Sequence, residues 1–226
     1  RSNKIIVLSR SWKKFYSEEV GIPEEKIIVL ENPVILPEKI EEERAKRTTV
    51  VYSGRIGRRK GAFDLIRAWG EISAKIRKKA ILILLGDGMD KEAREMVEEL
   101  GLQESCKILG WVEEEEKNRI LSDSKIFILP SKNEGLPMSL LEAMSYGLAP
   151  IVTPVGGIPD TVFEGENGTF VNPGDVKSIA RKLEELIEQE DLTERLGKKA
   201  RESVYRLGIE KYGPRLESIW NEALEK

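Results

Sequence analysis

The amino-acid sequence predicts an α/β protein built on a doubly wound parallel sheet. From Val50 onward, short β-branched runs alternate with longer segments in which apolar residues recur every three or four positions. Strands that alternate with crossover helices pair in parallel, so this alternation predicts one parallel sheet covered by helices. Ligands of such sheets bind beyond the carboxyl ends of the strands, where we expect the functional loops.

Each element follows from the local pattern of residues. The segment after the first β-branched run carries Phe63, Ile66 and Trp69 at helical spacing, which predicts an amphipathic crossover helix. A chain of 226 residues can bury a real core in one main domain. The candidate strands are residues 49–53, 80–85, 105–109, 126–130, 149–153 and, more weakly, 169–171, and the later helices are residues 175–189, 192–207 and 209–226.

The first 45 residues follow a different pattern from the rest. They predict a strand at 4–9, a helix at 10–20 and a strand at 26–30, followed by a link rich in proline and glutamate. We interpret them as the tail of another domain and the link out of it. The chain begins at Arg1 without an initiator methionine, which we interpret as a fragment boundary. The predicted divisions are residues 1–45, 46–208 and 209–226.

Composition excludes several classes of protein. The 37 basic and 40 acidic residues give a net charge of only -3, which argues against nucleic acid as a partner. No apolar run approaches the length of about 20 residues that a membrane span needs. The one cysteine, Cys106, lies in a predicted buried strand and fits a reducing, cytoplasmic location. Abundant lysine, arginine and glutamate resemble the surface ion-pair chemistry of proteins from thermophiles.

The chain has no histidine, which restricts the chemistry it can perform. Histidine is the most frequent general base, a frequent metal ligand and the partner of nucleophilic serine or cysteine. The chemistry must therefore rest on carboxylates, cations and backbone groups.

Two acidic residues eight positions apart form the strongest candidate site. Glu134 and Glu142 flank Gly135, Leu136 and Pro137, where a predicted strand leads into a helix. Pro137 suits the first helical position, so we expect the first amides of that helix to face the loops and hold a phosphate. Glu142 could accept two bonds from a ribose diol, and Glu134 could bind a sugar. Either carboxylate alone is more typical of a solvated loop or of an ordinary acid at a helix start.

Two cations after the first predicted strand form a second candidate site. Arg55 and Lys60 lie in a loop that also contains Gly57 and Gly61, which permit close backbone approach. Two fixed cations suit a diphosphate. The run of like charge in the same loop fits a solvated basic surface equally well.

Further glycine motifs follow the other predicted strands, and each alone is common in turns. Their value is that they fall at the same edge of the predicted sheet. They are Gly86-Asp87-Gly88, Gly110-Trp111-Val112 and Gly156-Gly157-Ile158-Pro159-Asp160. Tryptophans and methionines fall mostly at apolar helical positions typical of a core, with Trp111 as the exception.

Together and in order, these motifs resemble the retaining GT-B glycosyltransferases of family four, known as glycosyl transferases group 1. The resemblance covers residues 50–207. It rests on Ser53-Gly54-Arg55 with Lys60, Leu85-Gly86-Asp87-Gly88, Gly110-Trp111-Val112, Pro130-Ser131 with Glu134-Gly135, Glu142-Ala143-Met144 with Gly147, and Val155-Gly156-Gly157.

The resemblance implies a Rossmann-like half of a GT-B fold that binds a UDP- or GDP-linked sugar, without a metal ion or other cofactor. It implies that residues 1–45 are a remnant of the acceptor domain with its linker. It also implies that residues 209–226 are a helix crossing back toward that domain. Because most of the acceptor domain is absent, we expect this chain alone to be inactive.

The resemblance also implies roles for individual residues. Arg55 and Lys60 would contact the diphosphate and offset charge on the leaving group, and Glu134 would face the transferred sugar, so these three are the expected catalytic residues. Glu142 would bind the ribose. The remaining expected donor-binding residues are Gly54, Gly86, Gly88, Val112, Gly135 and Leu136.

Other interpretations remain open from the sequence. A module that binds a nucleotide sugar without turnover fits the same motifs, whereas a GT-B epimerase leans on histidine that this chain lacks. A phosphorylase would need a buried lysine bound to pyridoxal phosphate, and no lysine stands out for that role. The acceptor, a glycan, lipid or small molecule, and peripheral membrane attachment of the whole enzyme stay undetermined. Apolar stripes at both ends predict either self-association or folding against the domain.

Overall fold

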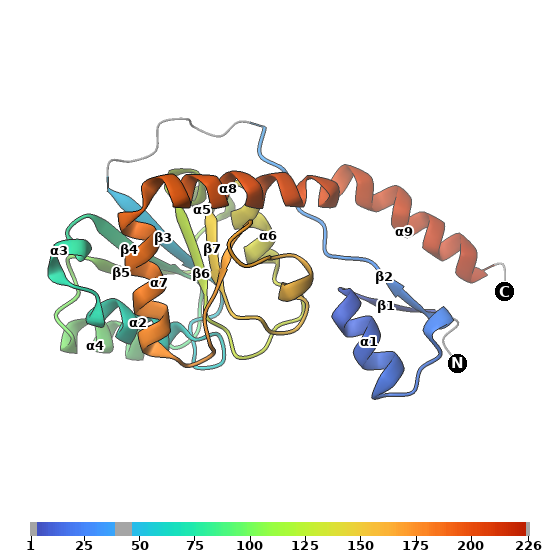
Figure 1. Ribbon diagram of the computed structural model, residues 1–226, viewed down its shortest axis with the longest axis horizontal. Helices are drawn as coiled ribbons and strands as arrows, with labels where there is room; N and C mark the ends of the chain where they lie inside the picture. The colour runs from blue at the N-terminus through green and yellow to red at the C-terminus, as the bar shows by residue number, and fades with distance from the viewer. Residues whose placement is uncertain (1–3, 39–46, 225–226) are drawn as a thin grey trace.

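The computed structural model describes residues 4–38 and 47–224, and its main body is a six-stranded parallel sheet of order β5-β4-β3-β6-β7-β8 (Figure 1). The predicted α/β fold and all six predicted strands are confirmed, with ends that differ by at most one residue. The strands are β3 (Thr48–Ser53), β4 (Ala80–Leu85), β5 (Cys106–Gly110), β6 (Ile126–Leu129), β7 (Ala149–Val152) and β8 (Thr169–Phe170).

The strand order contains a reversal that positions the site. The chain builds outward from β3 through β4 to β5, then crosses back to place β6 on the other side of β3. All four residues of β6 are fully buried, which explains their continuous apolar sequence. The carboxyl ends of β3 and β6 therefore meet at a topological switch point, where ligands of open α/β sheets bind.

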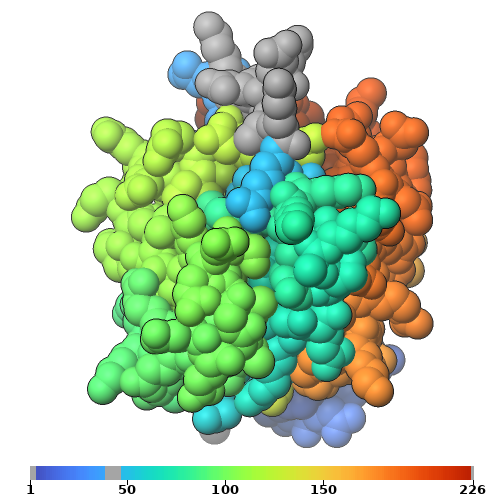
Figure 2. All heavy atoms as spheres, turned by 90° about the vertical axis from the view of Figure 1, so that its left-hand side faces the viewer, coloured from blue at the N-terminus to red at the C-terminus, as the bar shows by residue number. Residues whose placement is uncertain are grey.

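Helices cover both faces of the sheet. Helices α2 and α7 lie on the near face in Figure 1, and Figure 2 shows the segment that contains α2 between the segments that contain α4 and α7. Helix α5 lies behind the sheet (Figure 1). The helices of this body are α2 (Ala62–Glu71), α3 (Ala74–Arg77), α4 (Asp90–Glu99), α5 (Glu114–Asp123), α6 (Met138–Ser145), α7 (Val176–Glu188) and α8 (Glu190–Val204), with 3-10 turns η2 (Ile158–Asp160) and η3 (Tyr205–Leu207).

The N-terminal segment is a separate small unit in which the predicted order of strand, helix and strand is confirmed. Strands β1 (Ile5–Val7) and β2 (Ile27–Val29) pair in parallel, joined through α1 (Arg10–Glu18) and the 3-10 turn η1 (Glu24–Lys26). The predicted boundary at residue 45, and the terminal residues Arg1 and Lys226, lie outside the described residues, so the proposed division into domains stays a prediction.

The last helix, α9 (Ile209–Leu224), lies along this small unit (Figure 1). Arg215 donates from Nη2 to the Val29 carbonyl over 2.8 Å, and Glu31 receives both Arg206 and Arg215 as ion-pair partners. The predicted apolar stripe of α9 is buried at Ile219. Trp220, in the same stripe, is 58% exposed.

Candidate functional site

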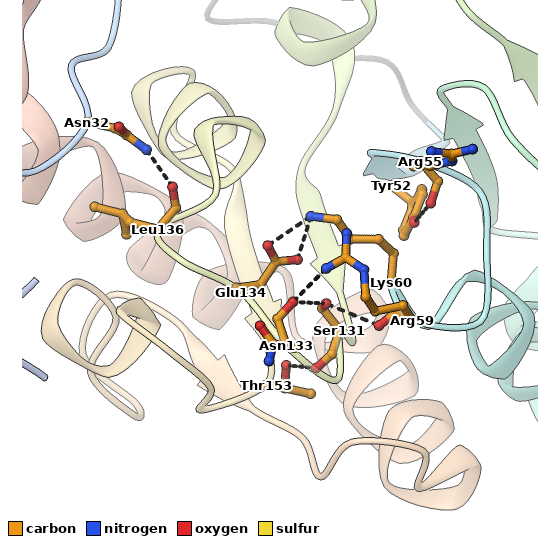
Figure 3. A network of polar contacts seen from close by, with 10 residues as sticks. All are labelled: Asn32, Tyr52, Arg55, Arg59, Lys60, Ser131, Asn133, Glu134, Leu136 and Thr153. Carbon is orange, nitrogen blue, oxygen red and sulfur yellow. Dashed lines mark hydrogen bonds and ion pairs between the residues drawn. The ribbon is translucent and has the colours of Figure 1, made fainter. Parts of the chain in front are cut away.

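The loops after β3 and β6 meet at the switch point and are packed backbone against backbone. Lys132 N–H donates to the Arg59 carbonyl over 2.8 Å, and the Arg59 guanidinium donates to the Asn133 carbonyl over 3.0 Å (Figure 3). Ser131 and Thr153 add further hydrogen bonds within this network. The network fixes the loop that carries Glu134 against the loop that carries Lys60.

Lys60 and Glu134 form an ion pair between these two loops. The Lys60 Nζ lies 2.7 Å from Oε1 and 2.8 Å from Oε2 of Glu134, so both carboxylate oxygens accept from one ammonium (Figure 3). The side chains are 18% and 5% exposed, respectively. Burial of two charges is costly unless they are paired in good geometry, and this pair meets that condition. The structure thus joins two predicted site residues that lie 74 positions apart.

Backbone hydrogen bonds also join the loops after β3 and β4, and their close approach requires a glycine at position 86. The Gly54 N–H donates to the Leu85 carbonyl over 2.9 Å, and the Ile56 N–H to the Asp87 carbonyl over 2.7 Å. A Cβ on Gly86 would lie 2.1 Å from the Gly54 carbonyl oxygen, and the Gly86 φ is +128°. Glycine at this position therefore allows the two loops to approach.

A second lysine–carboxylate pair involves a residue that the sequence analysis missed. Lys117 on α5 places its Nζ 3.1 Å from both carboxylate oxygens of Glu142 on α6. The two side chains are 26% and 28% exposed. Lys117 follows four consecutive glutamates at the start of its helix, and this lone cation beside the predicted Gly-Trp-Val turn was the available signal.

A cavity of about 370 Å³ opens beside this second pair. It brings together five predicted site residues, Gly54, Arg55, Gly86, Val112 and Glu142, and adds Lys117. Trp111 also lines the cavity and is 75% exposed, which agrees with the prediction that this tryptophan is not part of the core. Among the described carboxylates, none forms an ion pair with Arg55, so its guanidinium is open to an anion.

Five predicted residues do not line this cavity: Lys60, Gly88, Glu134, Gly135 and Leu136. Gly88 instead serves loop packing, because a Cβ there would lie 2.4 Å from the Ile56 carbonyl oxygen. The Leu136 carbonyl accepts from the Asn32 side-chain amide over 2.7 Å (Figure 3), and the Gly135 carbonyl accepts from Gly157 N–H over 2.6 Å. The N–H groups of Gly135 and Leu136, in contrast, have no hydrogen-bond acceptor among the described residues.

The start of α6 differs by one residue from the prediction. Pro137 occupies the N-cap with φ -70° and ψ 127°, and the helix begins at Met138, so the prediction of Pro137 as first helical residue is wrong. The extended ψ of the proline places it just outside the helix. The first-turn amides of Met138 and Ser139 lack a backbone acceptor in the described residues, as helix starts do.

The electrostatic effect of the site reaches a neighbouring tyrosine. Burial, and then the negative charge of Glu134, raise the pKa of Tyr52 well above its usual range. The Tyr52 hydroxyl therefore stays protonated, and it donates to the Arg55 carbonyl over 2.8 Å (Figure 3). Tyr52 thereby fixes the backbone of the loop that presents Arg55.

No three His, Cys, Asp or Glu side chains within residues 4–38 and 47–224 are grouped so that they could hold a metal ion. In the same ranges, the helices are too short or too polar for a membrane span.

The chain was compared with known proteins on the basis of sequence and fold. Residues 36–203 match the family model of glycosyl transferases group 1. A relative from Bacillus anthracis, N-acetyl-alpha-D-glucosaminyl L-malate synthase, is 31% identical over 163 residues, which are 71% of this chain and 42% of that protein.

Two solved structures share the fold. Sucrose-phosphate synthase from Thermosynechococcus elongatus superimposes with a TM-score of 0.87 at 23% identity, over 100% of this chain and 59% of that chain. Anabaena HepE, solved in complex with UDP and glucose, gives a TM-score of 0.84 at 20% identity, over 97% of this chain and 63% of that chain. The chain thus spans less than two thirds of the length of each of these two proteins, and less than half of the Bacillus anthracis relative.

Proposed function

The chain belongs to the family of glycosyl transferases group 1, and on that premise we propose that it is the donor-binding part of a retaining hexosyltransferase that uses a UDP- or GDP-linked sugar. The observation that carries this proposal is the pair of lysine–carboxylate contacts, Lys60–Glu134 and Lys117–Glu142, set around the switch point. Carboxylates bind sugar hydroxyls, and cations beside them bind a diphosphate. HepE, which shares the fold, was solved with UDP and glucose.

Each residue has a proposed role in donor binding. Arg55, whose guanidinium is open, binds the diphosphate together with the first-turn amides of α6. Glu142 exchanges its contact with Lys117 for the two ribose hydroxyls. The base lies in the cavity framed by Gly86 and Val112, which includes the exposed Trp111.

The reacting end of the donor lies at the buried ion pair. Glu134 faces the transferred sugar, and Lys60, held against both of its oxygens, offsets the charge that develops on the departing diphosphate. Catalysis then depends on positioning and on charge stabilisation in a closed cleft. The acceptor loses its proton to the leaving phosphate on the same face, which retains the anomeric configuration without a histidine base. Closure requires the acceptor domain, so we propose that this chain alone is inactive.

Two accompanying proposals concern metal ions and the cellular location. Cations and helix amides supply the positive groups for the diphosphate, so we propose that donor binding needs no divalent metal ion. The buried Cys106 thiol is consistent with a reducing, cytoplasmic site of action.

The test is calorimetric titration with UDP, GDP, UDP-glucose, UDP-N-acetylglucosamine and GDP-mannose, with EDTA throughout. We expect one nucleotide class to bind, and Arg55→Ala and Glu142→Ala to weaken it by at least about tenfold each. Arg67→Ala and Glu190→Ala serve as matched controls, because both residues form exposed ion pairs away from the site. Loss of affinity in the control variants would contradict the site assignment, as would wild-type protein that binds none of the ligands, alone or as the full-length enzyme.

A further inference from the structure

The N-terminal segment touches the loop of residues 134–136 from the side opposite Lys60. A Cβ on Gly135 would lie 3.3 Å from the Leu8 side chain, and a Cβ on Gly157 would lie 2.9 Å from the Ser9 Cβ. Gly157 in turn donates its N–H to the Gly135 carbonyl over 2.6 Å. The 134–136 loop and the turn at Gly157 are therefore packed together under the end of β1.

Asp160 ties this arrangement to α1. The Ser11 N–H donates to Oδ2 of Asp160 over 2.8 Å, and the Ser11 hydroxyl donates to Oδ1 over 3.0 Å. Ser11 is the second residue of α1, whose N-cap Ser9 accepts from Trp12 N–H over 3.1 Å. The Asp160 carboxylate thus satisfies an otherwise unpaired amide and lies at the positive end of the helix dipole. Because Asp160 closes the short turn η2 that follows Gly157, a contact with α1 fixes Gly157 as well.

The contact at Gly157 sets the direction of the Leu136 N–H, which the proposed function places toward the sugar of the nucleotide-sugar donor. A peptide group is planar, and its carbonyl and the next N–H point in opposite directions. With the Gly135 carbonyl held by Gly157, the Leu136 N–H must point away from Gly157. The Leu136 carbonyl is held independently by Asn32 of the N-terminal segment, so both the N–H and the carbonyl of this residue have a fixed direction.

We propose that Asp160 is a positioning residue for the transferred sugar: by fastening α1 to η2 it holds Gly157 on Gly135, and so aims the Leu136 N–H. This inference rests on the proposed function, since it assigns that loop to the sugar of the donor. It also means that the sugar end of the donor site depends on the N-terminal segment as well as on the main body, whereas the nucleotide end is built within the main body.

The experiment compares a nucleotide with its sugar conjugate. UDP and UDP-glucose, or GDP and GDP-mannose, are titrated calorimetrically into wild type, Asp160→Ala, Asp160→Asn and Ser11→Ala. We expect Asp160→Ala to weaken the sugar conjugate by at least about fivefold, at the low end of couplings between distinct sites, with little change for the nucleotide alone. Asp160→Asn keeps one acceptor oxygen, and Ser11→Ala keeps the backbone donor, so both are expected to give intermediate losses.

Asp175→Ala is the matched control, because Asp175 caps α7 by accepting from Ser178 N–H over 3.0 Å. It removes a similar helix cap that forms no hydrogen bond with the 134–136 loop among the described residues, and both ligands should bind it as they bind wild type. Equal weakening of nucleotide and conjugate by Asp160→Ala, or no weakening, would overturn the positioning role. Wild type that binds neither ligand would instead overturn the proposed function, and this inference with it.

Discussion

The two edges of the sheet both carry lysines, glutamates and a cavity, yet they are built differently. At the amino edge, a cavity of about 440 Å³ is lined by Arg47, Lys78, Lys79 and Lys125 together with Glu188 and Glu190. At the carboxyl edge, the cavity beside Glu142 measures about 370 Å³. Size and charge alone would therefore favour the amino edge over the edge of the proposed donor site.

The edges differ in what holds the charged groups. The lysines Lys60 and Lys125 are almost equally buried, at 18% and 16% exposed, but their partners Glu134 and Glu190 are 5% and 64% exposed. At the carboxyl edge, glycine loops in backbone contact carry the charges, whereas at the amino edge the charges lie at element ends beside solvent. The candidate site is distinguished from the amino edge by fixed, desolvated charge on loops in backbone contact.

The largest expected effect comes from breaking the backbone contact between loops. Gly156 has φ +60°, and a Cβ there would lie 1.9 Å from the Glu134 carbonyl oxygen. We expect Gly156→Ala to lower the free energy of unfolding by more than about 3 kcal/mol, since left-handed strain and a backbone clash add. Urea denaturation measures the change.

The matched variant is Gly101→Ala, close to the start of β5 at the amino edge. Gly101 has φ +65°, with no atom within 4 Å of an added Cβ. Only the strain of the left-handed conformation applies, and the expected loss is about 1–2 kcal/mol. Equal losses in the two variants would show that interlocking of the loops contributes nothing to stability.

The next effect concerns the two ion pairs. Glu134→Gln removes the charge of a carboxylate that is only 5% exposed, so water cannot replace the lost counter-charge of the Lys60 ammonium, and we expect a loss of about 3 kcal/mol in the free energy of unfolding. Glu190→Gln breaks a pair whose carboxylate lies in solvent, and less than about 1 kcal/mol is expected. Both are read from urea denaturation at neutral pH in 0.15 M salt. A larger loss for Glu190→Gln would reverse the comparison of the two edges.

A smaller effect should appear in alkali at the amino edge. Burial raises the pKa of the Cys106 thiol from its usual value near 9 to about 12. Above pH 9 the unfolded chain loses this proton while the folded chain keeps it, so stability falls with rising pH, by at most about 1.4 kcal/mol per pH unit. Unfolding free energies between pH 7.5 and 10 should show this slope in wild type and lose it in Cys106→Ala. Parallel pH profiles would contradict the burial effect.

Periodicity predicted the sheet because each strand has a buried face that must be apolar whatever it contacts. The fully buried run Ile126–Leu129 is the clearest case. Chain ends obey weaker constraints, and Trp220 shows this: it falls at a helical spacing typical of a covered stripe, yet it is 58% exposed. A stripe indicates that a surface is apolar, whereas only the packing decides which of its residues are covered.

For the candidate site, the sequence motifs predicted residues that the fold brings to one edge of the sheet, but they did not predict the partners of these residues. Glu142 on α6 contacts Lys117 on α5, and this contact depends on the positions of strands β5 and β6 in the sheet. Local sequence patterns do not encode the order of the strands. The sequence shows only that Gly86 and Gly88 lack a Cβ atom, and from this the motifs predict that both glycines face the ligand. Close contact with the Gly54 and Ile56 carbonyls explains Gly86 and Gly88 as loop-packing positions, and only the assembled fold reveals such contacts.

The smallest expected effect tests whether the carboxyl-edge cavity holds the base. Trp111 lines that cavity and is exposed, so a base stacked on it should quench its fluorescence. Trp111→Phe keeps an aromatic face, and the nucleotide should bind about threefold more weakly or less, but the quenching should disappear. Trp220→Phe removes another exposed tryptophan, on α9 and outside the cavity, and should keep the quenching. Quenching that survives in Trp111→Phe and vanishes in Trp220→Phe would place the base away from this edge.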